Sequence, residues 1–295
     1  MDIRVLRYFL AVAREGNISK AAEYLHITQP TLSRQLKELE EELGAELFIR
    51  GKRSISLTDE GMFLRKRAEE ITSLMDKTEA EFHQLDEFIS GDVYIGGGET
   101  LAMNILAEVM SEMNQEHPDV KFHLYSGNAD DVIDRIDKGL IDFGVIIEPA
   151  DIRKYETMRL AYTDKYGLIM RKDDPLAHNK YISIEELKKL PLLVAKRIVD
   201  SKYFPEILGI YPEDMNIKAT FNLIYNATLL VEQGMGYALT IDHLINTLGN
   251  NSLCFIPIEP EISVNLSVIW KRFQFFSKAS EEFLNRLKIK TKQFN

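Results

Sequence analysis

Residues 17–48 contain two helical patterns joined by four residues, and this layout restricts the fold more than any other feature of the chain. The small residues Ala21 and Ala22 let a second helix cross the first closely at a steep angle. Thr28 can cap the second helix, and Pro30 falls in its first turn, where a missing N–H costs nothing. The pattern predicts a helix-turn-helix, with DNA as the first partner to consider.

The second helix is expected to have a buried side and a polar side. Its leucines recur at steps of four, three and four residues, which predicts one buried stripe of Leu32, Leu36, Leu39 and Leu43, ended by Gly44. The glutamates near its C-terminal end would repel phosphate and favour a merely solvated helix, but in recognition helices the N-terminal residues reach the bases. The DNA-binding residues predicted in this region are Ser19, Lys20, Gln29, Pro30, Thr31, Ser33, Arg34 and Lys37.

A glycine turn flanked by cations follows the helix-turn-helix pattern. Arg50, Lys52 and Arg53 surround Gly51, and residues 54–57 alternate polar and apolar as a short strand does. The adjacent helix-turn-helix favours a wing whose cations contact phosphates or the minor groove, and a solvated basic turn is the alternative.

A long amphipathic helix is predicted from residue 59 onward, with Gly91 as its end. Its apolar residues alternate steps of four and three, the spacing of a heptad seam. Such a stripe favours pairing with a second copy of the chain, and packing back on its own domain is the alternative. The residues predicted to form the dimer seam are Leu64, Ala68, Ile71, Met75, Phe82 and Leu85.

The remaining chain alternates strand and helix patterns, which predicts parallel sheets with crossover helices. A first set is expected at residues 92–96, 100–116, 121–126, 129–138 and 141–147. A second set is expected at residues 165–171, 192–195, 215–221, 224–233 and 237–240, with a capping box from Ser183 to Glu186. The two sets predict two α/β lobes, and a final strand at 263–270 and a helix after Ser277 follow them.

A ligand site is expected beyond the carboxyl ends of these strands, where helix N-termini present free N–H groups. Thr100 follows a glycine run, and its hydroxyl can cap a helix, bond an effector, or do both. Cations near the second lobe's strand ends favour an anionic effector such as a carboxylate, and solvated loop cations are the alternative. The predicted effector-binding residues are Gly98, Thr100, Leu101, Lys196, Arg197 and Asn222.

Composition narrows the function classes. The 295 residues are 45% hydrophobic, enough for sizeable cores, and no apolar run approaches the length of a membrane span. We therefore expect a cytoplasmic protein that does not enter the membrane.

The single cysteine, Cys254, excludes an internal disulfide and is interpreted as a core thiol. The six histidines show no zinc spacing, and no nucleophile motif is present, so we predict no catalytic residues, no metal and no cofactor.

The chain resembles the LysR-type transcriptional regulators, through FLAVAREGNISKAAEYLHITQPTLSRQLKELEEELGAELFIR and LTDEG within residues 6–61, and more weakly through GVII and VEQGMGYAL. The resemblance implies an α+β multidomain chain: a winged helix-turn-helix, a long linker helix, and a two-lobed effector domain like periplasmic binding proteins. The expected bounds are 1–58, 59–90 and 91–295, with lobe I at 91–161 and 267–295 and lobe II at 162–266.

What the resemblance implies for partners is a homodimer or homotetramer on double-stranded promoter DNA, with a small-molecule effector between the lobes. The position matching Thr100 commonly touches the effector in this family. RNA polymerase is a further candidate partner.

Three hypotheses follow. The favoured one is a ligand-responsive, sequence-specific transcription factor. The second is a solute-binding module whose N-terminal domain serves only assembly, and the third is an enzyme with a regulatory appendage.

Overall fold

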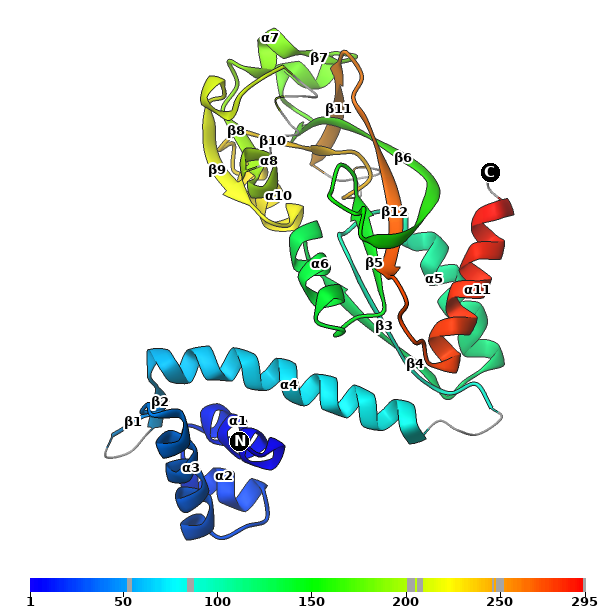
Figure 1. The fold of residues 1–295 in the computed structure, drawn as a ribbon. Coiled ribbons are helices and arrows are strands. Elements are labelled where there is room, and N and C mark those ends of the chain that lie inside the picture. The colour runs from blue at the N-terminus through cyan, green and yellow to red at the C-terminus, as the bar shows by residue number, and fades with distance from the viewer. Residues whose placement is uncertain are drawn as a thin grey trace. The chain divides into compact units, whose positions relative to one another are not determined.

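The computed structural model describes residues 1–51, 55–83, 88–200, 205, 209–245, 247 and 252–293, without the side chains of residues 50, 80–83 and 293. The chain consists of two compact units, Met1–Leu85 and Asp86–Asn295 (Figure 1). The first unit is mainly helical, and the second is built on a mixed sheet covered by helices.

The first unit is a winged helix-turn-helix. Its elements are α1 (Ile3–Glu15), α2 (Ile18–Tyr24), α3 (Gln29–Leu43), β1 (Phe48–Arg50), β2 (Ile55–Leu57) and α4 (Asp59–His83). The predicted ends of α3 are confirmed: the Thr28 side chain accepts a hydrogen bond from the N–H of Thr31, and Gly44 ends the helix with φ +66°. Strands β1 and β2 pair antiparallel, as expected of a wing.

The core of this unit is formed by α1, α2, α3 and the start of α4. Ala21 and Ala22 are fully buried in it, as the close helix crossing requires. Leu32, Leu36 and Leu39 are buried as predicted, but Leu43 is 42% exposed because α3 extends beyond the core in its last turn. A Cβ on Gly61 would lie 2.2 Å from the carbonyl oxygen of Leu47, so only glycine lets α4 approach the wing this closely.

The predicted seam of α4 is divided between two environments. Leu64 and Ala68 are buried in the core of their own unit, so their assignment to the dimer seam was wrong. Farther along the same helix, Ile71 and Met75 are 40% and 39% exposed. The side chain of Phe82, and all of Leu85, lie outside the described residues. The described part of the helix is Asp59–His83, and Gly91 is the first residue of the next strand.

The second unit has two α/β lobes. Lobe I contains β3 (Gly91–Gly97), α5 (Met103–Glu116), β4 (Val120–Ser126), α6 (Ala129–Asp137), β5 (Phe143–Ile147), β12 (Ser263–Lys271) and α11 (Lys278–Gln293). Lobe II contains η1 (Pro175–His178), β7 (Ile182–Ser183), α7 (Ile184–Leu187), β8 (Leu192–Ala195), α8 (Lys196–Asp200), η2 (Pro212–Asp214), β9 (Ile217–Phe221), α10 (Ile224–Glu232), β10 (Tyr237–Ile241) and β11 (Leu253–Glu259). The predicted capping box from Ser183 to Glu186 is present at α7.

One strand, β6 (Tyr155–Arg171), passes through both lobes (Figure 1). Its first part pairs with β12, and its last part pairs with β10 and β11. The sequence pattern predicted only residues 165–171, because polar residues interrupt the earlier part of the strand. The sheet order is β4-β3-β5-β12-β6-β10-β8-β9. The β3, β4 and β5 pairs and the β8, β9 and β10 pairs are parallel as predicted, whereas β6 and β12 run antiparallel to their neighbours.

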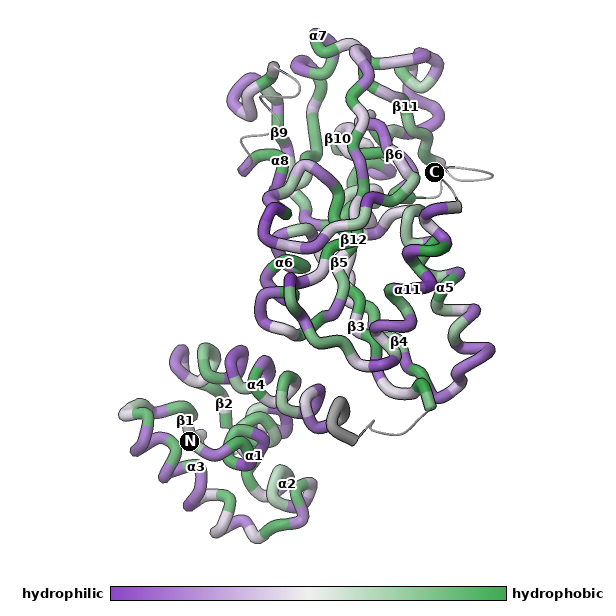
Figure 2. Tube along the Cα trace, turned by 45° about the vertical axis from the view of Figure 1, so that its right-hand side comes forward, coloured by the Kyte–Doolittle hydropathy of each residue, from purple (hydrophilic) through white to green (hydrophobic). Residues whose placement is uncertain are grey.

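Each lobe buries apolar residues on both faces of its sheet. In lobe I, α5 and α11 cover one face around Phe143 and Phe283, and α6 covers the other through Val132 and Ile136. Figure 2 shows hydrophobic residues following the strands through the middle of this unit. Cys254 lies half-buried on β11 against the lobe II core, so it is less enclosed than the predicted core thiol.

Candidate DNA-binding surface and effector pocket

The N-terminal half of α3 presents an exposed polar surface. The side chain of Gln29 donates a hydrogen bond to Ser33 Oγ at 2.8 Å, one turn along the helix. The side chains of Arg34 and Lys37 are each 71% exposed. Their nearest carboxylates are Glu38 and Glu41, at 3.7 and 3.5 Å, so both cations are held by weak i,i+4 pairs that a phosphate or a base can replace.

The other predicted DNA-binding residues lie around this surface. Ser19 and Lys20 are exposed in the first turn of α2, where Asn17 caps the helix by accepting from the N–H of Lys20 at 3.1 Å. Pro30 and Thr31 are exposed in the first turn of α3. In the wing, the backbone of Arg50 lies in β1 but its side chain is outside the described set, as are Lys52 and Arg53.

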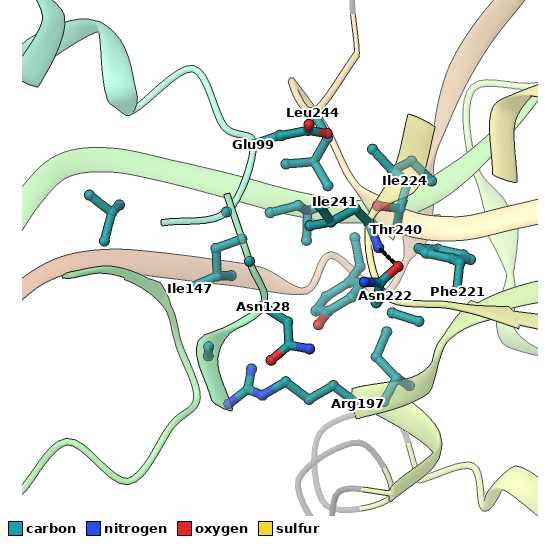
Figure 3. A pocket seen from close by; sticks show the side chains of 18 of the residues that line it. Glu99, Asn128, Ile147, Arg197, Phe221, Asn222, Ile224, Thr240, Ile241 and Leu244 are labelled. Carbon is teal, nitrogen blue, oxygen red and sulfur yellow. Dashed lines mark hydrogen bonds between the residues drawn. The ribbon is translucent and has the colours of Figure 1, made fainter. Parts of the chain in front are cut away.

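A cavity of about 140 Å³ lies between the two lobes, at the carboxyl ends of β5, β8 and β9. Its walls are mainly apolar, and its polar lining residues are Glu99, Asn128, Tyr166, Arg197, Asn222 and Thr240. Figure 3 shows Arg197 and Asn128 at one side of this pocket and Glu99 beside Leu244 at the opposite side. Two helices begin at the cavity wall, α6 after Asn128 and α10 after Leu223.

Arg197 spans the cleft at this cavity. It belongs to α8 of lobe II, and its guanidinium donates to the carbonyl oxygen of Pro149 in lobe I at 2.7 Å. Its Nε lies 3.8 Å from a carboxylate oxygen of Asp130, also in lobe I. Burial raises the pKa of Tyr166, and the charge of Arg197 opposes that shift only in part. The phenol therefore keeps its proton near neutral pH and can act as a hydrogen-bond donor in the cavity.

The predicted effector residues are divided between this cavity and a second hollow. Arg197 and Asn222 line the cavity, Thr100 and Leu101 line a neighbouring hollow of about 830 Å³, and Gly98 lines both. Lys196, the exposed first residue of α8, lines neither of them. The four predicted residues other than Lys196 and Gly98 are thus divided equally between two neighbouring hollows that share Gly98.

Thr100 has a different role from the predicted helix cap. Helix α5 begins at Met103 with Ala102 at its N-cap position, because a turn separates Thr100 from the helix. The Thr100 hydroxyl donates to Asp164 Oδ2 and accepts from the N–H of Ala102, both at 3.3 Å. It therefore links the entrance of α5 to β6 at the junction of the lobes.

Sequence reasoning did not find a cluster of Asp164, Asp242 and His243 beside Thr100. Nδ1 of His243 lies 3.1 Å from Asp164 Oδ1 and 3.4 Å from Asp242 Oδ1. Burial raises the pKa of Asp164, and the hydrogen bond to His243 opposes this shift. The two segments are far apart in the sequence, so no local spacing could indicate the cluster. Tyr166, Asn128 and Thr240 were missed for the same reason.

In the part of the chain that the structure describes, no helix combines the length and apolar character needed to cross a membrane.

Comparison with known proteins identifies related regulators. The regulator BsdA of Bacillus subtilis (strain 168) is 28% identical over 299 residues, covering 97% of this chain and 99% of the relative. The Hca operon transcriptional activator HcaR of Escherichia coli (strain K12) is 26% identical over 280 residues, covering 92% of each chain. Among solved structures, CbnR, a LysR family transcriptional regulator, has a TM-score of 0.74 at 19% identity, covering 99% of each chain.

Two protein families match this chain directly. Residues 3–62 match the bacterial regulatory helix-turn-helix proteins of the lysR family, and residues 87–291 match the LysR substrate binding domain. The families and relatives are those of regulators, not of enzymes. Together the two matches cover most of the sequence, and the chain belongs to the LysR family of bacterial helix-turn-helix transcriptional regulators.

Proposed function

We propose that this LysR-type regulator inserts the N-terminal half of α3 into the major groove of a two-fold promoter site, and that a small carboxylate bound between the lobes controls it. The observation that carries the DNA proposal is the exposed row of Gln29, Arg34 and Lys37 on a capped helix whose other side is packed in the core. Arginine and glutamine side chains read base edges by paired hydrogen bonds. Ser19, Lys20, Pro30, Thr31 and Ser33 position the helix, and the wing residues Arg50, Lys52 and Arg53 hold the DNA backbone.

This DNA proposal is tested by selecting binding sites from a pool of random duplex DNA with the full-length protein. The expected product is a two-fold repeated sequence whose half-sites lie about one or more helical turns apart, because a dimer presents two recognition helices. Recovery of no sequence above the starting pool would contradict sequence-specific binding.

We infer that a homodimer is the smallest unit that binds DNA, and that tetramers form from such dimers. Helix α4 exposes Met62, Phe63, Ile71, Leu74 and Met75, by between 39% and 67% of their surfaces. A helix with this much exposed apolar surface is favoured to pair with a second copy. We also propose that the protein works in the cytoplasm, because promoter DNA lies there. RNA polymerase is a candidate partner of the DNA-bound regulator.

Ile71→Asp is expected to weaken dimerisation by about tenfold or more, because a carboxylate placed against an apolar partner loses its hydration without gaining a counter-charge. The dissociation constant is measured by sedimentation velocity over a dilution series. Ser73→Asp, on an exposed part of the same helix, is the matched control. An unchanged constant for Ile71→Asp would exclude this residue from the interface.

The effector proposal depends on the charge and size of the cavity between the lobes. Helix α10 has no side-chain cap at its N-cap residue, so its first N–H groups can donate to an anion, and Arg197 lines the same cavity. An apolar protein cavity of about 150 Å³ takes one benzene ring. The cavity therefore suits a small carboxylate with one ring or a short branched chain. Such an anion competes with Pro149 and Asp130 for Arg197 and so changes a contact that joins the lobes.

Titration of the full-length protein with a panel of one-ring and short branched monocarboxylates, each paired with its neutral amide, tests this proposal by calorimetry. At least one acid is expected to bind about tenfold more tightly than its amide, because a charged hydrogen bond to Arg197 is stronger than a neutral one. Arg197→Gln should remove the difference, and Lys196→Gln, next to it in sequence but outside the cavity, should not. Equal affinities for acids and amides across the panel would contradict an anion site.

A further inference from the structure

Two carboxylates and an imidazole converge where β6 passes from lobe I to lobe II. Asp164 lies on β6, and Asp242 and His243 follow the end of β10. One ligand atom from each residue lies within 4.8 Å of the other two. His243 has φ +60°, a left-handed backbone conformation that is uncommon for a residue with a side chain. This turn brings the Nδ1 atom of His243 to both carboxylates.

The side chains around this cluster balance its charges only in part: the charge of Lys165 acts on Asp242, and His243 contacts both carboxylates. Asp164 is 1% exposed, and an ionised carboxylate at such depth is costly without a cation. Within the described residues, neither Asp164 nor Asp242 forms an ion pair with a lysine or arginine. The nearest lysine along the chain, Lys165, pairs with Glu261 at 2.5 Å. The imidazole of His243 offers at most one positive charge to two carboxylates.

We propose that Asp164, Asp242 and His243 bind a divalent transition-metal ion at the junction of the two lobes. Two carboxylate oxygens and one imidazole nitrogen form a ligand set that suits ions from Mn²⁺ to Zn²⁺. Metal–ligand distances near 2.1 Å separate adjacent ligand atoms by about 3.0–3.5 Å. The distances from Nδ1 of His243 to the two carboxylates, 3.1 and 3.4 Å, match that spacing.

Hydrogen-bond donors and a neighbouring hollow surround the three proposed ligands, as is usual at a metal site. The Thr100 hydroxyl donates to Asp164 Oδ2 at 3.3 Å, and the N–H of Lys165 donates to Asp242 Oδ1 at 2.7 Å. Hydrogen bonds of this kind orient ligating carboxylates. Thr100, Asp242 and His243 line the hollow of about 830 Å³, which provides an entry path and room for water at the remaining coordination positions.

A metal ion at this position would bind to three side chains of lobe II, and one of them is hydrogen-bonded to lobe I. Asp164 lies on the strand that joins the lobes, Asp242 and His243 follow β10, and Thr100 of lobe I is attached through Asp164. Binding would therefore hold the Asp164 carboxylate in the orientation in which it accepts from Thr100 of lobe I. This consequence does not depend on the chemical class of the effector in the neighbouring cavity.

The test uses the full-length protein after treatment with a chelator and dialysis. Titration with Co²⁺, Mn²⁺ or Zn²⁺ in a calorimeter should give one site per chain, and Co²⁺ should produce visible absorption bands from its coordinated state. Mg²⁺ should bind far more weakly. Asp242→Asn and His243→Gln should each weaken binding by at least about 100-fold, and Thr100→Val by about tenfold, the range expected for a group that orients a ligand.

His123→Gln is the matched control, because His123 also pairs with a carboxylate, that of Asp92, but on an exposed part of lobe I. It should leave metal binding unchanged. Asp242 and His243 are not fully buried, and circular dichroism of the metal-free variants should match that of the unaltered protein. Absence of a site in the unaltered protein would overturn the proposal and leave a hydrogen-bonded histidine as the role of this cluster. Equal binding by His243→Gln would also overturn it.

Discussion

Ala68→Asp is expected to destabilise the winged-helix unit by about 3–5 kcal/mol, the cost of leaving an uncompensated charge in a core. Ala68 is fully buried against α1 and the other core residues of this unit. A unit of this size has a total stability of only about 4–13 kcal/mol at 0.05–0.15 kcal/mol per residue. Loss of the core therefore removes most DNA binding as well. Hydrogen exchange measured by mass spectrometry should show lost protection in peptides from α1 to the start of α4.

Peptides from the second unit provide an internal control, since their protection should not change. Ser73→Asp adds the same charge to an exposed position of α4 and should leave the exchange of the first unit intact. If Ala68→Asp instead changed only the oligomeric state and kept full protection, Ala68 would belong to an interface between chains and the intramolecular packing would be contradicted.

Arg34→Ala is expected to weaken specific DNA binding by about 1–3 kcal/mol, or about 5- to 150-fold, while the fold stays intact. The guanidinium is 71% exposed, and the only ion pair described for it is the one with Glu38 at 3.7 Å, so its removal leaves no buried group unsatisfied. The affinity for the selected sequence and for an unrelated duplex is measured by gel-shift titration at one fixed salt concentration.

Arg153→Ala is the matched control for charge. Arg153 lies in the other unit, its side chain is 89% exposed, and its removal changes the net charge by the same amount. The affinity of the Arg153→Ala protein for DNA should equal that of the unaltered protein. Equal losses on the selected and the unrelated duplex would show that Arg34 contacts phosphate rather than bases. No loss on either duplex would exclude Arg34 from the DNA surface.

The helix-turn-helix could be predicted from sequence because its signals are local. Thr28, Pro30 and Gly44 act within a few residues of the helix ends that they determine, and the leucine spacing reports which side of α3 is buried. Leu43 departs from this pattern because burial depends on where the neighbouring helices end, which no spacing within α3 records.

The stripe on α4 shows the limit of periodicity more clearly. A heptad pattern indicates that one side of a helix is apolar, but it does not say which partner covers that side. Leu64 and Ala68 are covered by their own unit, whereas Ile71 and Met75 remain exposed on the same helix. Which residues of α4 are covered depends on how the other elements of the unit pack against this helix.

The sequence by itself determined the capped helix α3, most of the other helices and strands, and their alternation in two lobes, because these depend on signals between near neighbours. Its motifs also indicated the family. The tertiary structure decided that β6 passes through both lobes, that Arg197 reaches Pro149 across the cleft, and that Asp164 meets His243. These contacts join residues between 48 and 79 positions apart. Their partners are chosen by packing and by the pairing of buried charges, which a linear pattern does not contain.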